Sequence, residues 1–297
     1  CKVYLIEKSH YLGGLGKVVT LSNKTLCEAF YHHFFMNDEY LIGFLKRFIY
    51  KAPTYKNSSM AIFFEKNHYP WNGLSDLMFY PQISFFSKIR FIIFTLILSK
   101  GFLSKKMLDK TSLSQGMQKL FGVQSFRTIW GPILNGKFGN KVDQIPLRWM
   151  AGRLKQRIES RKFGVEKLGY LEGSIFKLTE RITQFINKSN DSKIYKSTEI
   201  NKIIFNKKIS KYNIQLNNKN KNITIKNIDK LIFTTNQNVT KNILRENSIK
   251  GISSLKNHKY FTAYCVLMEL NESLSEFYWT NIADKSIYFC GYIEQTN

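Results

Sequence analysis

The chain has 297 residues, of which 43% are hydrophobic and 15% aromatic, so it can bury a large core and is not disordered. Its length suggests two domains. The formal net charge of +24 comes from lysines scattered among Asn and Ile rather than gathered in one motif. This pattern favours a compositional bias over a specific nucleic-acid reader. An anionic substrate, an acidic membrane surface and nucleic acid are the alternatives.

Four cysteines are present, and none of them forms a C-x-x-C pair or a metal-ligand spacing. Cys1, Cys27, Cys265 and Cys290 therefore predict reduced thiols and no metal site. No signal peptide is visible. We expect a cytoplasmic protein, with membrane association as an alternative, and the sequence does not indicate its oligomeric state.

The first sixteen residues carry the most informative pattern. Residues 3–7 are four apolar residues followed by Glu7, which predicts a buried parallel strand that ends on a carboxylate. Gly13 and Gly14 follow after five residues and predict a tight turn or a close backbone approach. In dinucleotide-binding folds such an acid accepts hydrogen bonds from ribose hydroxyls. An ordinary Gly-rich loop after a buried strand is the alternative.

The spacing from Glu7 to Gly13-Gly14 resembles the second half of the FAD fingerprint in one flavoprotein superfamily. Its members are the flavin-containing amine oxidases, protoporphyrinogen oxidases and phytoene desaturases. The resemblance implies an α/β fold, in which an incomplete Rossmann-like FAD-binding domain carries an inserted α+β substrate domain. It assigns FAD contacts to Glu7, Gly13, Gly14, Leu15 and Gly16. Leu15 stands where the family has arginine, so a cationic contact near the flavin diphosphate is lost.

Two parts of the family pattern are missing from the sequence. No G-x-G-x-x-G turn occurs, and the C-terminal Gly-Asp segment that contacts flavin in the family is absent. We therefore expect a fragment that begins inside the flavin domain. Such a fragment should bind FAD poorly and be inactive alone.

Residues 17–21 and 25–30 predict two short strands, and a histidine pair follows them. Adjacent histidines on an extended segment point to opposite faces, and no second ligand pair follows, so a metal site is disfavoured. The segment 27–33 resembles one that enters the flavin and substrate cavity in the family. This makes His32 and His33 candidate catalytic residues, with pKa values expected near neutrality.

The middle of the chain predicts mainly helices. Helices are expected over residues 40–48 and 113–121 and a short one from residue 75, with a hairpin over residues 61–70. Residues 83–103 are the most apolar stretch, but charged residues leave fewer than the ~20 apolar residues that span a bilayer. A buried helix is expected there, and a helix lying against a membrane is the alternative.

Trp149, Arg153 and Arg157 recur every four residues, which places them on one face of a helix. Such an arginine pair can bind a carboxylate, phosphate or diphosphate. A solvated face is the alternative, in which Arg157 or Arg161 pairs with Glu159 or Glu166. The block also resembles one bacterial subgroup of the superfamily. The resemblance assigns substrate binding to Trp130, Lys137, Trp149, Arg153 and Arg157.

The following segment resembles the family's return to the flavin domain. Gly173-Ser174 replaces a Gly-Gly pair before a helix over residues 175–187, with Ser174 as its expected N-cap. Tyr170, just before this turn, is a third candidate catalytic residue by position. A strand over residues 199–205 resembles the family's second signature, in which the backbone of Ile200 would contact the adenine edge.

The last third predicts strands. Residues 212–225 form an expected hairpin, and residues 229–236 an expected buried parallel strand with Thr234 near its tip at the cofactor crevice. Strands are also expected over residues 261–270, 277–282 and 288–294. The expected domains are residues 1–36 and 166–245 for FAD binding, and residues 37–165 and 246–297 for the substrate.

Three functions follow from these patterns. The first is an FAD-dependent oxidoreductase that passes a hydride equivalent from an anionic or lipophilic small molecule to flavin. The second is another flavin-dependent enzyme of a different class, a sugar-nucleotide mutase resembling UDP-galactopyranose mutase. The third is a non-enzymatic nucleic-acid-binding protein, motivated only by the charge of +24.

Overall fold

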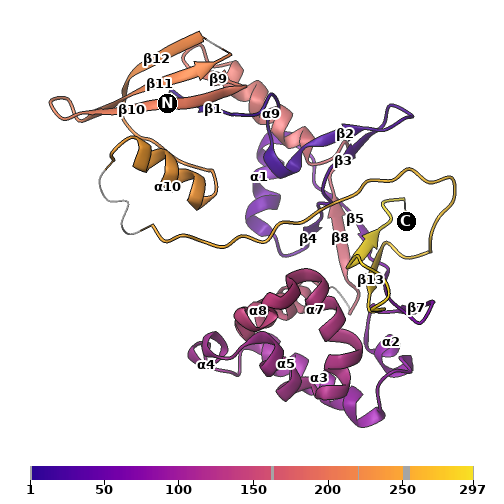
Figure 1. Cartoon of the computed structure of the whole chain (residues 1–297). Coiled ribbons are helices and arrows are strands. Elements are labelled where there is room, and N and C mark those ends of the chain that lie inside the picture. Colours follow the sequence, from indigo (N-terminus) through magenta and orange to yellow (C-terminus); the bar gives the residue numbers. More distant parts are fainter. Residues whose placement is uncertain (1, 162–163, 220, 250–254, 297) are drawn as a thin grey trace. The chain divides into compact units, whose positions relative to one another are not determined.

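The computed structural model describes residues 2–161, 164–219, 221–249 and 255–296. The chain divides into two compact units, and helices and strands are mixed along it (Figure 1). Unit 1 comprises Cys1–Phe30 and Gly173–Leu267, and unit 2 comprises Tyr31–Glu172 and Met268–Asn297. The sequence predicts the corresponding boundaries after residues 36, 165 and 245. Cys1 lies outside the described residues.

Unit 1 begins with the expected parallel strand. β1 (Tyr4–Ile6) pairs in parallel with β9 (Lys193–Tyr195), so the direction of this pairing is confirmed. The strand is half-buried rather than fully buried, because β9 is its one partner among the described residues. Within the described part of the chain, β1 is therefore an edge strand of a two-stranded pair.

An antiparallel sheet of three strands forms most of the core of unit 1 (Figure 1). The expected hairpin over residues 212–225 is confirmed, although Asn220 in its turn lies outside the described residues. Ile214, Leu216 and Ile225 are buried in the sheet, and residues of β1 pack against them. The strands of this sheet are β10 (Thr198–Asn206), β11 (Lys211–Asn218) and β12 (Lys221–Ile228).

The rest of unit 1 is a small ribbon and two helices. The expected strand pair is confirmed as β2 (Val18–Thr20) and β3 (Leu26–Glu28). The helices are α9 (Phe176–Asn187) and α10 (Gln237–Glu246), and Asn236 caps α10 with its side chain. The expected strand over residues 229–236 is wrong. This segment is a coil in which Ile232 is 85% exposed, since none of the described sheets offers it a neighbouring strand.

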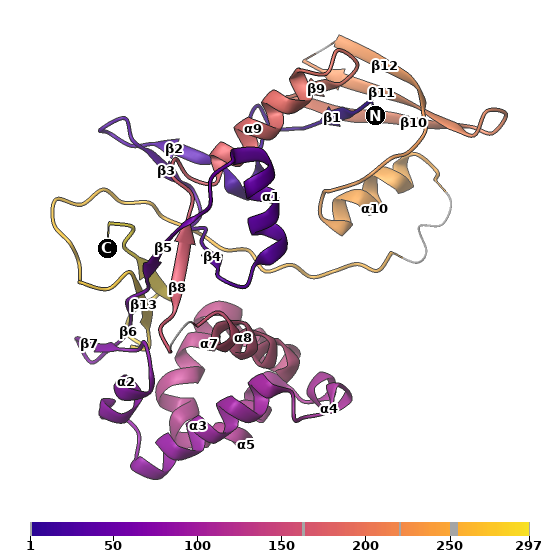
Figure 2. The ribbon, with the colours of Figure 1, turned by 180° about the vertical axis from the view of Figure 1, so that it is seen from behind.

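Unit 2 contains a body of helices, whose ribbon Figure 2 shows from behind. These helices pack around one hydrophobic core. Serine side chains cap three of its helices, at Ser84, Ser104 and Ser112. Of the residues that the structure describes, no helix has the length and apolar character to cross a membrane. The α-helices of unit 2 are α1 (Glu39–Ile49), α2 (Leu74–Phe79), α3 (Phe85–Lys100), α4 (Lys105–Lys110), α5 (Leu113–Phe121), α6 (Val123–Ser125), α7 (Gly131–Phe138) and α8 (Leu147–Glu159).

Two small sheets complete unit 2, in the orders β14-β13-β6-β7 and β4-β8-β5. The expected hairpin over residues 61–70 is confirmed, and Glu65 and Lys66 in its turn both have positive φ. The strands are β4 (Phe34–Phe35), β5 (Thr54–Asn57), β6 (Met60–Phe64), β7 (Asn67–Pro70), β8 (Lys167–Tyr170), β13 (Trp279–Ile282) and β14 (Gly291–Ile293).

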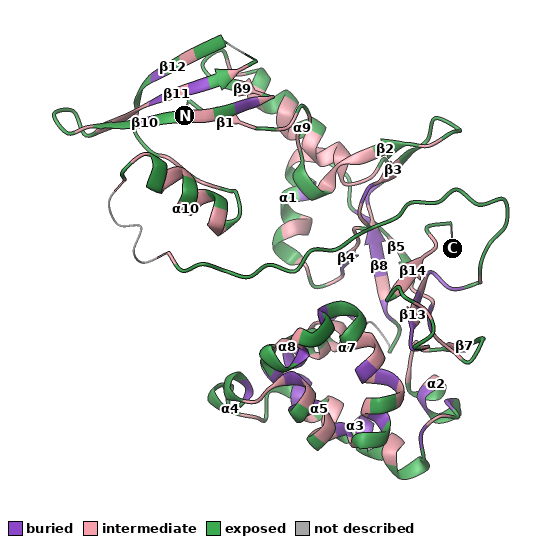
Figure 3. Ribbon diagram, viewed as in Figure 1, coloured by how far each residue is buried: buried purple, intermediate pink, exposed green. Residues whose placement is uncertain are grey.

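The expected strand over residues 261–270 is also wrong. The segment is an exposed coil, drawn in green in Figure 3, and Tyr264 and Val266 are 94% and 80% exposed. It runs from unit 1 into unit 2 and has no neighbouring strand in the described sheets. Apolar β-favouring residues therefore did not suffice to form a strand here, because a strand also needs a partner.

Candidate functional site

Glu7 lies directly after β1, at the carboxyl end of the parallel pair. Its backbone N–H donates to the Tyr195 carbonyl over 2.9 Å, and its own carbonyl accepts from Thr198 N–H over 3.0 Å. The Ser9 N–H donates to Glu7 Oε1 over 2.7 Å. The backbone of Glu7 is thus held between β9 and β10, and its carboxylate is oriented by a neighbouring amide. This placement suits an acid that binds ribose hydroxyls.

The glycine loop adopts a conformation that other residues rarely adopt. Gly13 has a φ of +102°, and a Cβ added there would lie 3.0 Å from Thr179 Oγ1 of α9. Gly14 has a φ of +54°, and a Cβ added there would meet nothing within 4 Å. One glycine therefore packs the loop against α9, and the next leaves bare backbone beside open space. Leu15, in the place of the family's arginine, is 68% exposed.

These residues fit the adenosine side of a dinucleotide cofactor. The carboxylate of Glu7 offers acceptors for sugar hydroxyls, and the open side of Gly14 would let a bulky ligand approach the backbone. Gly16 closes the turn by donating its N–H to the Gly13 carbonyl over 2.8 Å. The loop is therefore a defined turn and not a loose linker.

Sequence reasoning missed the role of Glu28. Its Oε1 accepts from the Ile175 N–H at 2.8 Å, so the carboxylate caps the start of α9. Ser174, the expected N-cap, lies one residue before the cap position, and its Oγ accepts from Phe176 N–H at 3.1 Å. The pairing links residues 147 positions apart, so no local pattern in the sequence could reveal it.

Ile200 and Thr234 have different environments. Ile200 lies in β10, and its side chain packs against the same buried residues as Ile6 of β1, the strand that leads to Glu7. Thr234 lies in the exposed coil after β12. It is therefore not at the tip of a parallel strand, which corrects the expectation on which its cofactor role was based.

His33 is half-buried among aromatic rings in unit 2. Its ring centre lies 5.2 Å from that of Phe35 and 6.3 Å from that of Trp279, both edge-to-face. Burial, followed by the Arg157 guanidinium, lowers the pKa of His33 to about 4, so the expectation of a near-neutral pKa is wrong for this residue. His33 is neutral at pH 7. His32 beside it is also half-buried, and the described residues contain no cluster of three metal ligands.

Two cationic side chains lie beside the Trp149 ring, Lys137 from α7 and Arg153 from α8. The Arg153 guanidinium lies 5.6 Å from its ring centre, and the Lys137 ammonium lies 5.4 Å from it. Burial of the ammonium and the neighbouring Arg153 charge lower the pKa of Lys137, although the residue as a whole reaches solvent. Three of the five expected substrate-binding residues are thus brought together. The two charges repel each other, which favours an anion beside the indole.

Arg157 has a structural partner instead. Its Nη1 lies 3.3 Å from Glu166 Oε2, and the Glu166 side chain is 2% exposed. Ser58 Oγ donates to the same carboxylate oxygen at 3.3 Å. The sequence left this pairing open as the alternative to substrate binding. In the structure Arg157 neutralises a buried acid, so the anion-attracting charge of α8 falls mainly to Arg153.

Trp130, the remaining expected substrate-binding residue, lies in the helical core. Its ring stacks on Phe91 at 5.6 Å with an interplanar angle of 9°, and it also contacts Phe121. These contacts are with core side chains, not with Lys137 or Arg153. Trp130 therefore packs as a core residue.

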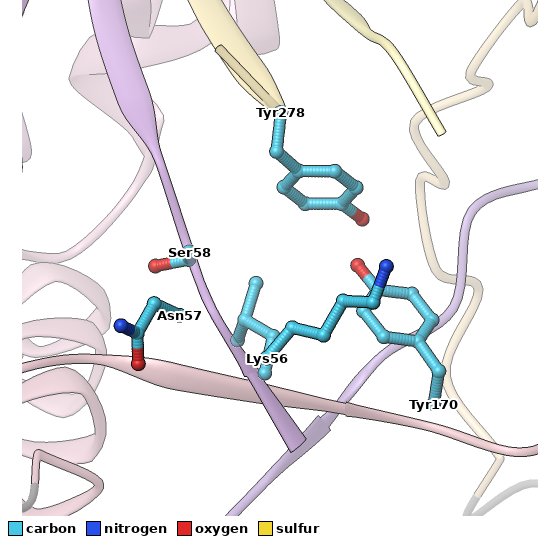
Figure 4. A pocket seen from close by; sticks show the side chains of 6 residues that line it. Lys56, Asn57, Ser58, Tyr170 and Tyr278 are labelled. Atoms are coloured by element: carbon cyan, nitrogen blue, oxygen red, sulfur yellow. The ribbon is translucent and has the colours of Figure 1, made fainter. Parts of the chain in front are cut away.

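Tyr170 lines a small cavity of about 10 Å³ in unit 2, which is room for about one water molecule (Figure 4). Its ring centre lies 5.9 Å from that of Tyr278. In Figure 4 the hydroxyls of the two tyrosines and the ammonium of Lys56 converge. Sequence reasoning missed Lys56 and Tyr278, because they come from segments far apart in the chain and share no motif with Tyr170. The lining residues are Lys56, Asn57, Ser58, Leu168, Tyr170 and Tyr278.

Both units mix helices and strands, with a parallel strand pair and glycine turn in unit 1 and a body of helices and small sheets in unit 2. No family model and no curated protein matches the chain. The fold is similar to the solved structure of a protein from Exiguobacterium sp. 255-15 that is assigned provisionally as a protoporphyrinogen oxidase. The identity is 14% over 95% of this chain, with a TM-score of 0.58.

A second solved structure with a similar fold is that of reduced UDP-galactopyranose mutase. Here the identity is 12% over 84% of this chain, with a TM-score of 0.55. The chain spans 64% of the length of the first protein and 53% of the second. At these identities the likeness establishes a shared fold.

Proposed function

We propose that the chain is part of an FAD-dependent enzyme of the amine oxidase and protoporphyrinogen oxidase type, with unit 1 as an incomplete Rossmann-like FAD-binding domain. The observation that carries this proposal is Glu7 at the carboxyl end of a parallel strand, followed by a turn with Gly13 and Gly14 at positive φ. The shared fold with the Exiguobacterium protein supports it. When bound, FAD supplies the redox chemistry, as the acceptor of a hydride equivalent from the substrate.

Each residue of unit 1 has a specific task in this proposal. The Glu7 carboxylate, oriented by the Ser9 N–H, accepts hydrogen bonds from ribose hydroxyls. Gly14 lets the backbone approach the cofactor without a Cβ, and the amides of this turn replace the missing arginine at Leu15. The backbone of Ile200 contacts the adenine edge in this proposal, and its side chain packs against the same buried residues as β1.

Unit 2 holds an anionic substrate in this proposal. The Trp149 indole offers a flat apolar surface, and Lys137 and Arg153 offer positive charge beside it. A carboxylate or phosphate would relieve the repulsion between the two cations. A small molecule with an aromatic or lipophilic part and an acidic group suits this combination. His32, His33 and Tyr170 are the groups that we propose for proton handling, and a pKa of about 4 makes His33 a weak base at pH 7.

A flavin-dependent sugar-nucleotide mutase is the second candidate. The fold likeness to UDP-galactopyranose mutase favours it, as does a cation pair that suits a diphosphate. Activity that needs reduced flavin without net electron transfer would support the mutase. Net oxidation of the substrate with release of hydrogen peroxide would eliminate it.

The test of the proposed function is FAD binding by the purified chain, measured by isothermal titration calorimetry. We expect weak, saturable binding, because the family's phosphate turn is not in this sequence. Glu7→Gln removes the negative charge from the acceptor and should weaken binding about 10-fold or more, since hydrogen bonds to charged groups contribute about 1.5–3 kcal/mol.

Glu180→Gln is the matched control, because Glu180 is an exposed acid of α9 in the same unit. It should leave FAD affinity unchanged. The proposal fails if the wild-type chain shows no saturable binding, or if the two variants have the same affinity.

A further inference from the structure

The three-stranded sheet of unit 1 has an apolar face and a polar face. Ile214 and Leu216 are buried on the apolar face, and residues of β1 pack against them. Side chains alternate between the two faces of a strand, so the residues between these positions lie on the opposite side. Gln215 is paired with Lys202 on one neighbouring strand and with Thr224 on the other, which places the three in one row. We name this polar side the outer face: Lys202, Gln215, Asn217, Asn222, Thr224 and Lys226.

Residues 200–228, which make up most of this sheet, have charges of one sign. They include seven lysines and no Asp or Glu, so all 21 acidic residues of the chain lie outside this segment. Lys211 is paired with Asp229 at 3.0 Å. The other six lysines are exposed, and none of them forms an ion pair within the described part of the chain. These are Lys202, Lys207, Lys208, Lys219, Lys221 and Lys226. The sheet therefore has a positive charge that its own residues do not compensate.

The lysines are spread along the whole length of the sheet. Lys207 and Lys208 lie in the turn between β10 and β11, and Lys221 begins β12 at the opposite end. Lys202 and Lys226 lie between these ends on the outer face. The 8 residues of β11 extend about 26 Å at ~3.3 Å per residue. Because phosphates follow one another at about 3.4 Å along a nucleic-acid strand, such a length can face about seven of them.

Amide side chains lie between the lysines of the outer face. Asn217 of β11 and Asn222 of β12 are exposed and directly opposite each other in the register, and Gln215 follows on the same side. An amide both donates and accepts hydrogen bonds, so it can contact sugar hydroxyls and base edges. Base edges are accessible in single strands, where they are not paired. The outer face therefore offers cations for phosphates and amides for sugars and bases.

We propose that the outer face of the sheet β10-β11-β12 binds single-stranded nucleic acid. Lys202 and Lys226 bind its phosphates, together with the lysines at both ends of the sheet, and the amides contact sugars and bases. The surface is independent of the proposed FAD site, because β1 packs against the other side of the sheet. Its charge selects a polyanion over a second copy of the chain, since two such cationic faces repel each other.

Fluorescence anisotropy of a labelled oligouridine tests the proposal with the whole chain and without added FAD. The RNA has about 16 nucleotides, and its affinity is measured from about 50 mM to about 200 mM salt. We expect saturable binding whose affinity falls linearly with salt on logarithmic axes, because each phosphate contact releases counterions. On a single strand each contact contributes about 0.7 to this slope.

A matched pair of double variants locates the surface. Lys202→Glu with Lys226→Glu reverses two charges of the outer face and should weaken RNA binding about 10-fold or more, while lowering the salt slope by about 1.4. Lys105→Glu with Lys106→Glu makes the same change in net charge at exposed positions of α4 in unit 2, and should leave the affinity and the slope unchanged. Circular dichroism verifies that both variants fold.

Three results would overturn the proposal. The first is no saturable binding of the RNA by the wild-type chain at about 50 mM salt. The second is equal weakening in the two double variants, which would make the total charge of the chain responsible rather than this face. The third is complete displacement of the RNA by phosphatidylglycerol vesicles at an equal concentration of phosphate, which would make an anionic lipid surface the partner.

Discussion

The helices of units 1 and 2 differ in how far they bury their side chains. Helices of unit 2 bury large side chains completely, such as Leu113, Met117 and Phe121 of α5. Buried stretches of the chain are drawn in purple in Figure 3. In unit 1, α9 and α10 bury no side chain fully. The glycine turn at Gly13 depends on backbone conformation instead. The helices of unit 2 should therefore be sensitive to side-chain volume, and the glycine turn of unit 1 to backbone freedom, while the buried core of unit 1 lies in its antiparallel sheet at residues such as Leu216.

Phe121→Ala should have the largest effect. Phe121 is fully buried and contacts Phe91 and Trp130, so its removal leaves a cavity and should lower the free energy of unfolding by about 3–5 kcal/mol. Urea unfolding followed by tryptophan fluorescence measures it. Phe102→Ala, at an exposed site, should change it by less than about 0.5 kcal/mol. Equal effects would show that unit 2 does not depend on packing.

His33 should make the stability of unit 2 depend on pH. Its pKa is lowered from 6.5 to about 4 in the folded chain, so between these values the unfolded state binds more protons. Stability should fall as pH drops from about 6.5 to about 4, by up to about 3 kcal/mol. In urea unfolding at several pH values, His33→Gln should flatten this slope and His10→Gln, at an exposed site, should not. If the free energy of unfolding depends on pH equally in wild type and His33→Gln, the lowered pKa of His33 is contradicted.

Glu166→Ala tests whether the buried ion pair of unit 2 is structural. The change leaves the Arg157 guanidinium without its carboxylate and should lower the free energy of unfolding by about 1–3 kcal/mol. Glu159→Ala removes an exposed acid whose contact with Lys155 is weak, and should change it by less than about 1 kcal/mol. If both variants unfold at the same urea concentration, Arg157 is available for a substrate.

Gly13→Ala should have the smallest effect and act on unit 1. The positive φ of +102° and the 3.0 Å approach to Thr179 Oγ1 both disfavour a Cβ, so the turn should lose about 1–2 kcal/mol. Gly14→Ala lies beside open space at a φ that L-residues tolerate better, and should cost about 1 kcal/mol. The rate of hydrogen exchange at the backbone amides of α9 measures how far each of the two variants destabilises the turn. Faster exchange in Gly14→Ala than in Gly13→Ala would contradict this account.

Local patterns in the sequence predicted the local elements well. The strand before Glu7, the hairpin after Ala61 and the helix ended by Gly122 all form where expected, because alternation, turn residues and glycine act over a few positions. The strands expected over residues 229–236 and 261–270 do not form. Strand pairing depends on a neighbour, and nothing within a segment specifies whether a neighbour exists.

The candidate site was predictable only where it is local. Glu7 and the two glycines are close in sequence, and Trp149 and Arg153 share one helix turn, so spacing alone brought each set together. Spacing in the sequence did not identify the partners of Arg157 and Tyr170. The sequence left Glu166 as one alternative for Arg157, and it gave no sign that Lys56 and Tyr278 line the cavity of Tyr170. Those contacts are tertiary.

The exposed coil over residues 261–270 has a practical consequence. Phe261 and Tyr264 are accessible there, so chymotrypsin should cut the native chain first at this connection. The downstream piece contains β13, which pairs with β6 on one side and β14 on the other. Its hydrogen bonds to β6 should hold the two pieces together after cleavage, so the nicked protein should migrate as one species until denaturant separates it.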